Sequence, residues 1–209
     1  MKQLIDPIRN WIRAMIRYLA RWLNKVSAGK VTPDGVTIFG LLMHVPIAML
    51  IARGRFGLAA VLLIIFGLFD TLDGELARIQ GKASVRGMLL DASTDRMKEV
   101  MLYSGAGFYL AQGTNPTVAV WAVLACGASL TVSYVKAKGE AVVASGQNKI
   151  APEVLNKMFA DGLLTFEVRI CVLLLGLFTG QLLVAVAGIA VLASLTALQR
   201  LITISEKLT

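Results

Sequence analysis

The apolar positions of the chain are concentrated in five or six long runs, separated by short polar breaks. Runs of this kind predict membrane-spanning helices, because about 20 apolar residues in a helix cross the hydrocarbon core of a bilayer. The breaks contain glycine, proline, asparagine or paired basic residues, which interrupt helices. We expect six spans, at residues 34–52, 57–80, 86–112, 116–139, 154–179 and 182–204.

The first 30 residues follow a different pattern. Basic side chains recur at every fourth position, at Arg9, Arg13, Arg17, Arg21 and Lys25, and apolar residues fill the opposite side at helical spacing. This predicts a basic amphipathic helix that lies in the headgroup layer of a membrane. A helix that binds a soluble partner is the alternative. The segment does not have the apolar core and small-residue cleavage site of a cleavable signal.

Composition agrees with a membrane protein. Apolar residues make up 56% of the 209 residues and charged residues only 16%, whereas soluble domains carry about 25% charged residues. We therefore expect an all-α integral membrane protein with six transmembrane helices preceded by an N-terminal amphipathic interfacial helix. Residues 1–30 would form the juxtamembrane helix and residues 31–209 one six-helix domain, since no repeat or linker is evident.

The net charge of +8 comes from basic residues that flank the expected spans. Most of them lie before the first span, between the second and third, and around the fourth connection, whereas Arg53 and Arg55 lie on the other side. Because basic residues favour cytoplasmic loops, we expect a multi-pass protein of the cell membrane with both termini in the cytoplasm. No basic face lies outside the membrane-proximal segments, which argues against nucleic acid as a partner.

Four aspartates stand out among the apolar runs. They occupy the frame Asp70-x2-Asp73-Gly74-x2-Ala77-Arg78-x8-Gly87-x3-Asp91-x3-Asp95. The spacings of three and four residues put each pair on one helix face. Ionised carboxylates are costly in such surroundings, and facing pairs would repel each other without a cation. Hard divalent cations prefer oxygen ligands, so the frame predicts a metal site at the cytoplasmic boundary.

The residue types around the aspartates indicate a phosphate ligand. Gly74 and Ala77 leave room for a bulky group, and Arg78 and Arg86 are placed to meet phosphate oxygens. Two divalent ions on Asp70, Asp73 and Asp91 would polarise a diphosphate, and Asp95 would accept a proton from an attacking hydroxyl. Glu75 is either a further metal ligand or a carboxylate at the rim.

The frame resembles the signature of the CDP-alcohol phosphotransferase family, D-x2-D-G-x2-A-R-x8-G-x3-D-x3-D, and every fixed position is present. The resemblance implies a six-helix membrane fold, a homodimer, and transfer of a substituted phosphate from a CDP-linked lipid, CDP-diacylglycerol, to an alcohol with release of CMP. It implies Mg2+ or Mn2+, two ions in all, on Asp70, Asp73 and Asp91, with Asp95 as ligand or general base. Residues implied in the CDP-lipid site are Gly74, Ala77, Arg78, Gly87, Asp34 and Thr37, although the last two are also suited to helix capping.

The second half of the chain indicates the acceptor alcohol. Ser133-Tyr134-Val135-Lys136-Ala137-Lys138-Gly139-Glu140 is similar to the S-Y-[IV]-K-A-R-x-E segment of the bacterial phosphatidylinositol phosphate synthases, a branch of that family. Its cations suit a phosphorylated acceptor, with inositol phosphate favoured. The residues expected to bind the acceptor phosphate are Arg86, Ser133, Lys136, Lys138 and Arg169.

Two departures from that branch leave other acceptors open. Lys138 stands where the branch has arginine, and Phe166 takes the first position of its Arg-x-x-Arg element, which leaves Arg169 alone. The lysines are equally explained by snorkelling to the membrane boundary. A phosphatidylglycerophosphate synthase is therefore the alternative within the family. An ion transporter is a different class of protein, which would place its acidic residues at mid-membrane, commonly in repeats; here they lie near one boundary and no repeat is evident. An inactive relative would have lost a motif aspartate, and none is replaced here.

Overall fold

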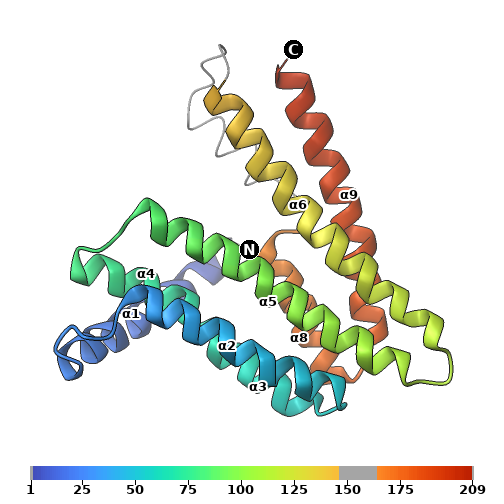
Figure 1. Cartoon of the computed structure of the whole chain (residues 1–209), viewed down its shortest axis with the longest axis horizontal. Coiled ribbons are helices and arrows are strands. Elements are labelled where there is room, and N and C mark those ends of the chain that lie inside the picture. Colours follow the sequence, from blue (N-terminus) through green and yellow to red (C-terminus); the bar gives the residue numbers. More distant parts are fainter. Residues whose placement is uncertain (1, 146–163, 209) are drawn as a thin grey trace. The chain divides into compact units, whose positions relative to one another are not determined.

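The computed structural model describes residues 2–145 and 164–208, with side chains described for 14–142, 145 and 164–206. Helices account for all regular structure in these residues, so the all-α prediction is confirmed. In chain order the elements are α1 (Lys2–Val26), α2 (Pro33–Ala52), α3 (Phe56–Gly67), α4 (Phe69–Gln80), α5 (Val85–Ala111), the short 3-10 helix η1 (Pro116–Ala119), α6 (Val120–Ser145), α8 (Phe166–Thr179) and α9 (Leu182–Leu208) (Figure 1).

Local sequence explains where the helices begin and end. The backbone N–H of Gly35 donates to the Thr32 hydroxyl at 3.1 Å, which caps α2 just before Pro33 in its first turn. Gly81 and Gly180 end α4 and α8 in the left-handed conformation, at φ 63° and 71°. Glycine adopts this conformation without a steric penalty. The expected breaks at these two glycines are therefore confirmed.

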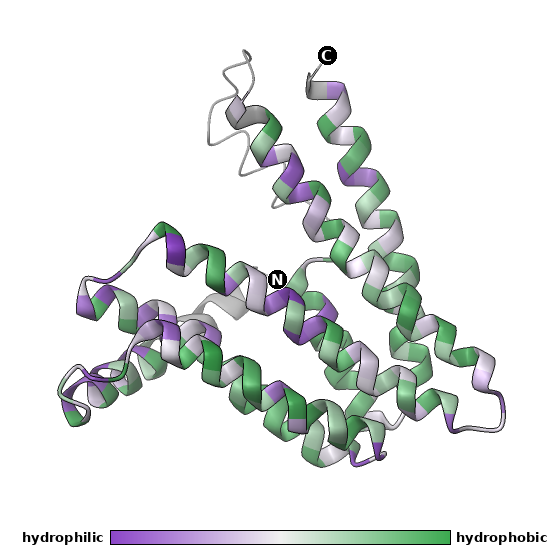
Figure 2. Cartoon of the chain, in the orientation of Figure 1, coloured by the Kyte–Doolittle hydropathy of each residue, from purple (hydrophilic) through white to green (hydrophobic). Residues whose placement is uncertain are grey.

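Four helical stretches of the described residues are long and apolar enough to cross a membrane: Pro33–Ala52, Phe56–Gln80, Pro116–Val142 and Leu182–Glu206. The expected span 86–112 forms the continuous helix α5, but its first half carries charged residues at 86, 91, 95, 96, 98 and 99. Figure 2 shows hydrophilic stretches along α5, whereas α2 and α3 are mostly hydrophobic. Of the expected span 154–179, residues 154–163 lie outside the described residues, as do the side chains of Arg9 and Arg13.

The expected span 57–80 is interrupted once. Leu68 separates α3 from α4, and its N–H bonds to the carbonyl of Ile65, three residues back, at 3.3 Å. This tighter turn directly follows Gly67 and precedes Asp70 by two residues. The first two motif aspartates therefore lie on α4, a separate helix of 12 residues.

The chain divides into two compact units. Unit 1 comprises Met1–Met49 and Leu58–Met101, and unit 2 comprises Leu50–Gly57 and Leu102–Thr209. In unit 1 the amphipathic helix α1 packs against the motif helix α4. The apolar core at this contact consists of Ile16 and Ala20 of α1, Leu72 and Leu76 of α4, and Val36 of α2. The helix expected at 1–30 is thus present, and one of its faces covers the motif helix.

In unit 2, α6 lies along α9, and α8 packs against α9 (Figure 1). Small residues allow these close approaches, as is usual between membrane helices. Small residues also meet between α5 and α6, where a Cβ atom added to Gly107 would lie 3.4 Å from that of Ala122. At Gly176 the space is smaller, because an added Cβ would lie only 2.3 Å from the Cβ of Ala185 on α9.

The α8–α9 contact therefore depends on the missing side chain of Gly176. We expect Gly176→Ala to destabilise the protein by about 1–3 kcal/mol through overpacking, a fall in Tm of roughly 2–12 °C in detergent. Gly188→Ala on α9 is the matched control, because no atom lies within 4 Å of the position of its added Cβ. Equal Tm values for the two variants would contradict this packing.

Candidate functional site

The four motif aspartates lie on two helices of unit 1. Asp70 and Asp73 belong to α4, and Asp91 and Asp95 belong to α5. Lys98, one turn after Asp95, joins the two helices: its ammonium group donates to Oδ1 of Asp70 and, at 3.2 Å, to Oδ1 of Asp95. The structure thus brings one carboxylate of each pair to a common cation, the ammonium group of Lys98.

Asp73 is held from a third helix. The Thr37 hydroxyl on α2 lies 2.5 Å from Oδ2 of Asp73 and 3.1 Å from the carbonyl oxygen of Pro33. A hydroxyl has one proton to donate, and the shorter contact indicates that Asp73 accepts it. Both side chains are buried, so this bond fixes the carboxylate relative to the start of α2.

Asp91 has an unsatisfied oxygen. Its Oδ1 is buried and accepts no hydrogen bond from the described residues. A buried carboxylate oxygen without a partner is costly. A bound cation would remove that cost, so the donor set fits a divalent metal ion. Within the described part of the chain, however, no three acidic, histidine or cysteine side chains already form a complete metal cage.

Glu75 is buried and paired with two arginines. Its carboxylate accepts from Arg78 at 2.8 Å and forms an ion pair with Arg17 of α1 at 3.6 Å. These contacts favour the rim interpretation over the metal-ligand interpretation. Arg86 lies 3.7 Å from Asp34, and both side chains are accessible to solvent, which leaves them available to a ligand.

The small motif residues leave open space beside the carboxylates. No atom lies within 4 Å of the position that a Cβ on Gly74 would take. Gly87 lies in the first turn of α5, where its N–H donates to the Ser84 hydroxyl at 3.1 Å. Ala77 is half-buried one turn after Asp73. A ligand can therefore approach the α4 backbone next to Asp73.

The basic residues expected to bind the acceptor lie in unit 2, except Arg86. Arg169 on α8 is 1% exposed and donates to the carbonyl of Leu164 at 3.2 Å. Arg200 on α9 is also buried, donates to the carbonyl of Val132 at 3.4 Å, and lies close enough to Arg169 for their charges to repel. The structure thus places two arginines together where the sequence suggested one.

The other expected acceptor residues lie on α6. Lys138 and Lys136 are exposed, and Lys136 lies 3.9 Å from Glu140. The Ser133 hydroxyl is half-buried and donates to the Ser129 carbonyl at 3.2 Å. The exposure of the two lysines agrees both with ligand binding and with snorkelling.

Sequence reasoning missed two residues near these sites, Lys98 and Arg200. Lys98 carried a usable signal, because it lies three residues after Asp95 on the same helix face. Arg200 interrupts an apolar run, just as Arg169 does. His44 on α2 is buried and donates from Nδ1 to the Gly40 carbonyl of the same helix at 2.7 Å, which agrees with a role in helix packing.

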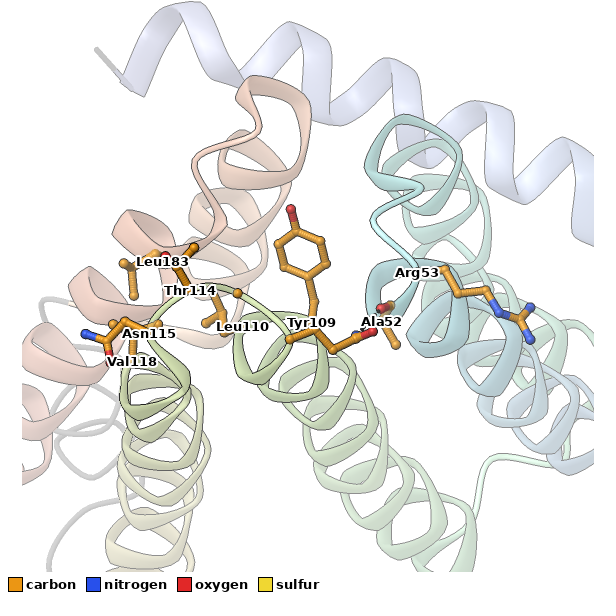
Figure 3. A pocket seen from close by; sticks show the side chains of 10 residues that line it. Ala52, Arg53, Tyr109, Leu110, Thr114, Asn115, Val118 and Leu183 are labelled. Carbon is orange, nitrogen blue, oxygen red and sulfur yellow. Dashed lines mark hydrogen bonds between the residues drawn. The ribbon is translucent and has the colours of Figure 1, made fainter.

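A cavity of about 410 Å³ lies elsewhere, in unit 2 (Figure 3). It is lined by the end of α2, the end of α5 and the start of η1, with Tyr109 between them. Tyr109 packs against Phe56 with ring centroids 4.7 Å apart, and the side chain of Arg53 extends away from Thr114 and Asn115. The cavity contains none of the residues expected in a site.

Relatives with known names resemble large parts of the chain. A phosphatidylinositol phosphate synthase of Mycobacteroides abscessus is 38% identical over 112 residues, 53% of this chain and 51% of the relative. The synthase of Corynebacterium glutamicum is 40% identical over 54% of this chain and 52% of its own length. A bifunctional IPC transferase and DIPP synthase of Rubrobacter xylanophilus is 31% identical over 84% of this chain and 37% of its own length. The chain thus matches about half the length of the two synthases.

Solved structures match over more of the chain. The crystal structure of the Mycobacterium tuberculosis phosphatidylinositol phosphate synthase with CDP-DAG bound has a TM-score of 0.76 and 28% identity, covering 91% of this chain and 94% of that one. The same synthase in complex with manganese and citrate has a TM-score of 0.75 and 28% identity, with coverages of 91% and 88%.

The family itself follows from a match over most of the chain. Residues 30–195 match the CDP-alcohol phosphatidyltransferase family. This range contains both aspartate pairs and extends through Arg169. The protein therefore belongs to the CDP-alcohol phosphatidyltransferase family.

Proposed function

We propose that the protein is a divalent-metal-dependent phosphatidyltransferase. It transfers the phosphatidyl group of CDP-diacylglycerol to a hydroxyl of inositol phosphate and releases CMP and phosphatidylinositol phosphate. The observation that carries this proposal is the four-aspartate cluster, with all family positions filled and Asp70 and Asp95 joined across two helices. The names of the mycobacterial and corynebacterial relatives support the choice of substrates.

The metal site consists of Asp70, Asp73 and Asp91, with Asp95 as a further ligand or the base. The unsatisfied oxygen of Asp91 supports this assignment, as does the manganese complex of a relative. We propose Mg2+ or Mn2+, two ions in all, because both prefer carboxylate oxygens. When bound, the ions neutralise the carboxylates and polarise the diphosphate of the donor.

In the transfer step Asp95 takes the proton of the acceptor hydroxyl. The hydroxyl oxygen forms a bond to the lipid-linked phosphorus, and the bond between that phosphorus and the CMP oxygen breaks. CMP leaves with the electron pair, and no covalent enzyme intermediate is needed. Gly74, Ala77, Arg78 and Gly87 line the CDP-lipid site, together with Asp34 and Thr37. The bond from Thr37 to Asp73 also gives Thr37 a positioning role.

A phosphorylated acceptor is favoured by the basic residues of unit 2. Buried guanidinium groups bind phosphate well, because they offer several donors in a fixed plane. Arg169 and Arg200 supply such groups, and Ser133, Lys136 and Lys138 of α6 and Arg86 of α5 are the other proposed contacts. Glycerol phosphate, the acceptor of a phosphatidylglycerophosphate synthase, has the same phosphate chemistry and is the second candidate.

We also propose the topology expected from the sequence: six spans, with both termini and the active site in the cytoplasm, and a homodimer. Helix α1 would lie in the headgroup layer. Its exposed Tyr18 and Trp22 support this, because amphipathic aromatic side chains favour the membrane interface. The contact of α1 with α4 would then hold the aspartates near the membrane surface.

The activity is tested by CMP release from the purified full chain in detergent. CDP-diacylglycerol with Mg2+ or Mn2+ is offered inositol 1-phosphate and glycerol 3-phosphate in parallel. We expect CMP with inositol phosphate and none after removal of the metal with EDTA. Release of CMP with glycerol phosphate alone would contradict inositol phosphate as the acceptor. Release of no CMP with either alcohol would contradict the proposed enzyme class and leave the transporter alternative.

The role of Asp95 is tested by Asp95→Asn. Loss of the general base is expected to lower kcat by about 10²- to 10⁴-fold. Binding of CDP-diacylglycerol, measured by calorimetry in the presence of Mn2+, is expected to stay within about threefold, since the amide keeps the size and part of the polarity of the carboxylate. Full turnover in this variant would exclude Asp95 as the base.

Lys138→Ala tests the acceptor site. Loss of one charge-assisted contact is expected to raise the KM for inositol phosphate roughly three- to tenfold. The kcat and the KM for CDP-diacylglycerol should change little. Lys25→Ala, an exposed lysine near the end of α1, serves as the control. An unchanged acceptor KM in Lys138→Ala would favour snorkelling instead.

A further inference from the structure

Among the described side chains of unit 1, Lys98 is the most deeply buried cation. Its side chain is 2% exposed, and its ammonium group donates to both Asp70 and Asp95. A buried ammonium group must be paired, because it has lost its water. Helical side chains lean toward the N-terminus, so a lysine three residues after Asp95 reaches back to that carboxylate and across to α4.

The charge of Lys98 changes the balance of the cluster. Four carboxylates carry −4, and Lys98 reduces this to −3. Arg96 also lies 3.7 Å from Asp95, but it pairs with Glu99 at 2.7 Å, so these two charges offset each other. With two divalent ions bound, the net charge of the cluster would therefore be +1. Without Lys98 it would be 0, so the lysine favours the binding of an anionic diphosphate.

We propose that Lys98 is a built-in counter-ion of the metal site. It holds Asp70 and Asp95 together when no metal is bound, and its charge weakens the binding of divalent cations. It is a positioning residue that acts through the two carboxylates. This inference rests on the proposed metal site. Its consequence is that the site stays assembled without metal and does not hold its cations excessively tightly.

A lysine with a purely structural role would behave differently. Its removal would lower stability, but it would leave the intrinsic affinity for a cation unchanged or reduced. If Lys98 is a counter-ion that repels the metal, its removal must raise the affinity for a cation, because the repulsion between the two positive charges is lost. Metal affinity and stability without metal therefore distinguish the two roles.

The test measures the binding of Mn2+ alone to the full chain in detergent, by the electron paramagnetic resonance signal of free Mn2+. We expect Lys98→Gln, which keeps a hydrogen-bonding group without the charge, to bind Mn2+ about tenfold or more tightly than the wild type. Lys98→Arg keeps the positive charge, so its affinity for Mn2+ should stay within about threefold of the wild type. Lys82→Gln, an exposed lysine in the connection between α4 and α5, is the control for charge in general.

Thermal unfolding gives a second readout. In EDTA the Tm of Lys98→Gln should lie below that of the wild type, because the carboxylates then repel each other without compensation. Saturating Mn2+ should raise the Tm of this variant more than that of the wild type, since tighter binding to the folded state adds stability.

Unchanged or weaker Mn2+ binding by Lys98→Gln overturns the proposal. If that variant fails to fold even in Mn2+, Asp95→Asn/Lys98→Gln is compared with Asp95→Asn alone, and equal affinities overturn it as well. If the wild type does not bind Mn2+, or if Asp73→Asn binds it as tightly as the wild type does, the proposed metal site itself is contradicted. The failure of the inference and that of the proposed function are thus separate outcomes.

Discussion

Compensation of buried negative charge is the constraint on which unit 1 depends. The four aspartates lie in a chain that is 56% apolar, and each must find a donor or a cation. Asp70 and Asp95 share the ammonium of Lys98, and Asp73 accepts from Thr37. Asp91 keeps one buried oxygen unsatisfied. The protein thus supplies part of the compensation itself and leaves the buried oxygen of Asp91 to the proposed metal ions.

This constraint also explains the departures from regular membrane helices. The segment 57–80 is interrupted at Leu68, so the aspartates fall on a short helix covered by the apolar face of α1. Helix α5 carries too many charges in its first half to resemble a lipid-exposed span. Polar groups within a membrane protein are tolerated where protein surrounds them, and contacts from α1, α2 and α4 provide that protein here.

The sequence could predict features that depend on residues close together in the chain, because its patterns describe neighbours along one helix. Spacing along one helix determines neighbours, so the aspartate faces and the breaks at Gly81 and Gly180 were predictable. Contacts between helices depend on packing, which a single sequence does not encode in its spacing. The hydrogen bond from Thr37 to Asp73 joins residues 36 positions apart, and no pattern in the sequence predicted it. Arg200 and Arg169 are 31 positions apart on different helices, and their proximity was equally hidden.

The proposed site residues are divided between the two units, and this division suggests how specificity for the acceptor alcohol is determined. The residues proposed for metal and donor belong to unit 1, and those proposed for the acceptor, apart from Arg86, belong to unit 2. The proposed chemistry at phosphorus uses the carboxylates whatever alcohol attacks, so we expect it to tolerate little change in unit 1. A phosphate-bearing acceptor needs only cations with suitable spacing, and arginine and lysine differ in how they provide them. If Lys138 belongs to the proposed acceptor site, the lysine in place of an expected arginine changes acceptor recognition and leaves the proposed transfer step untouched.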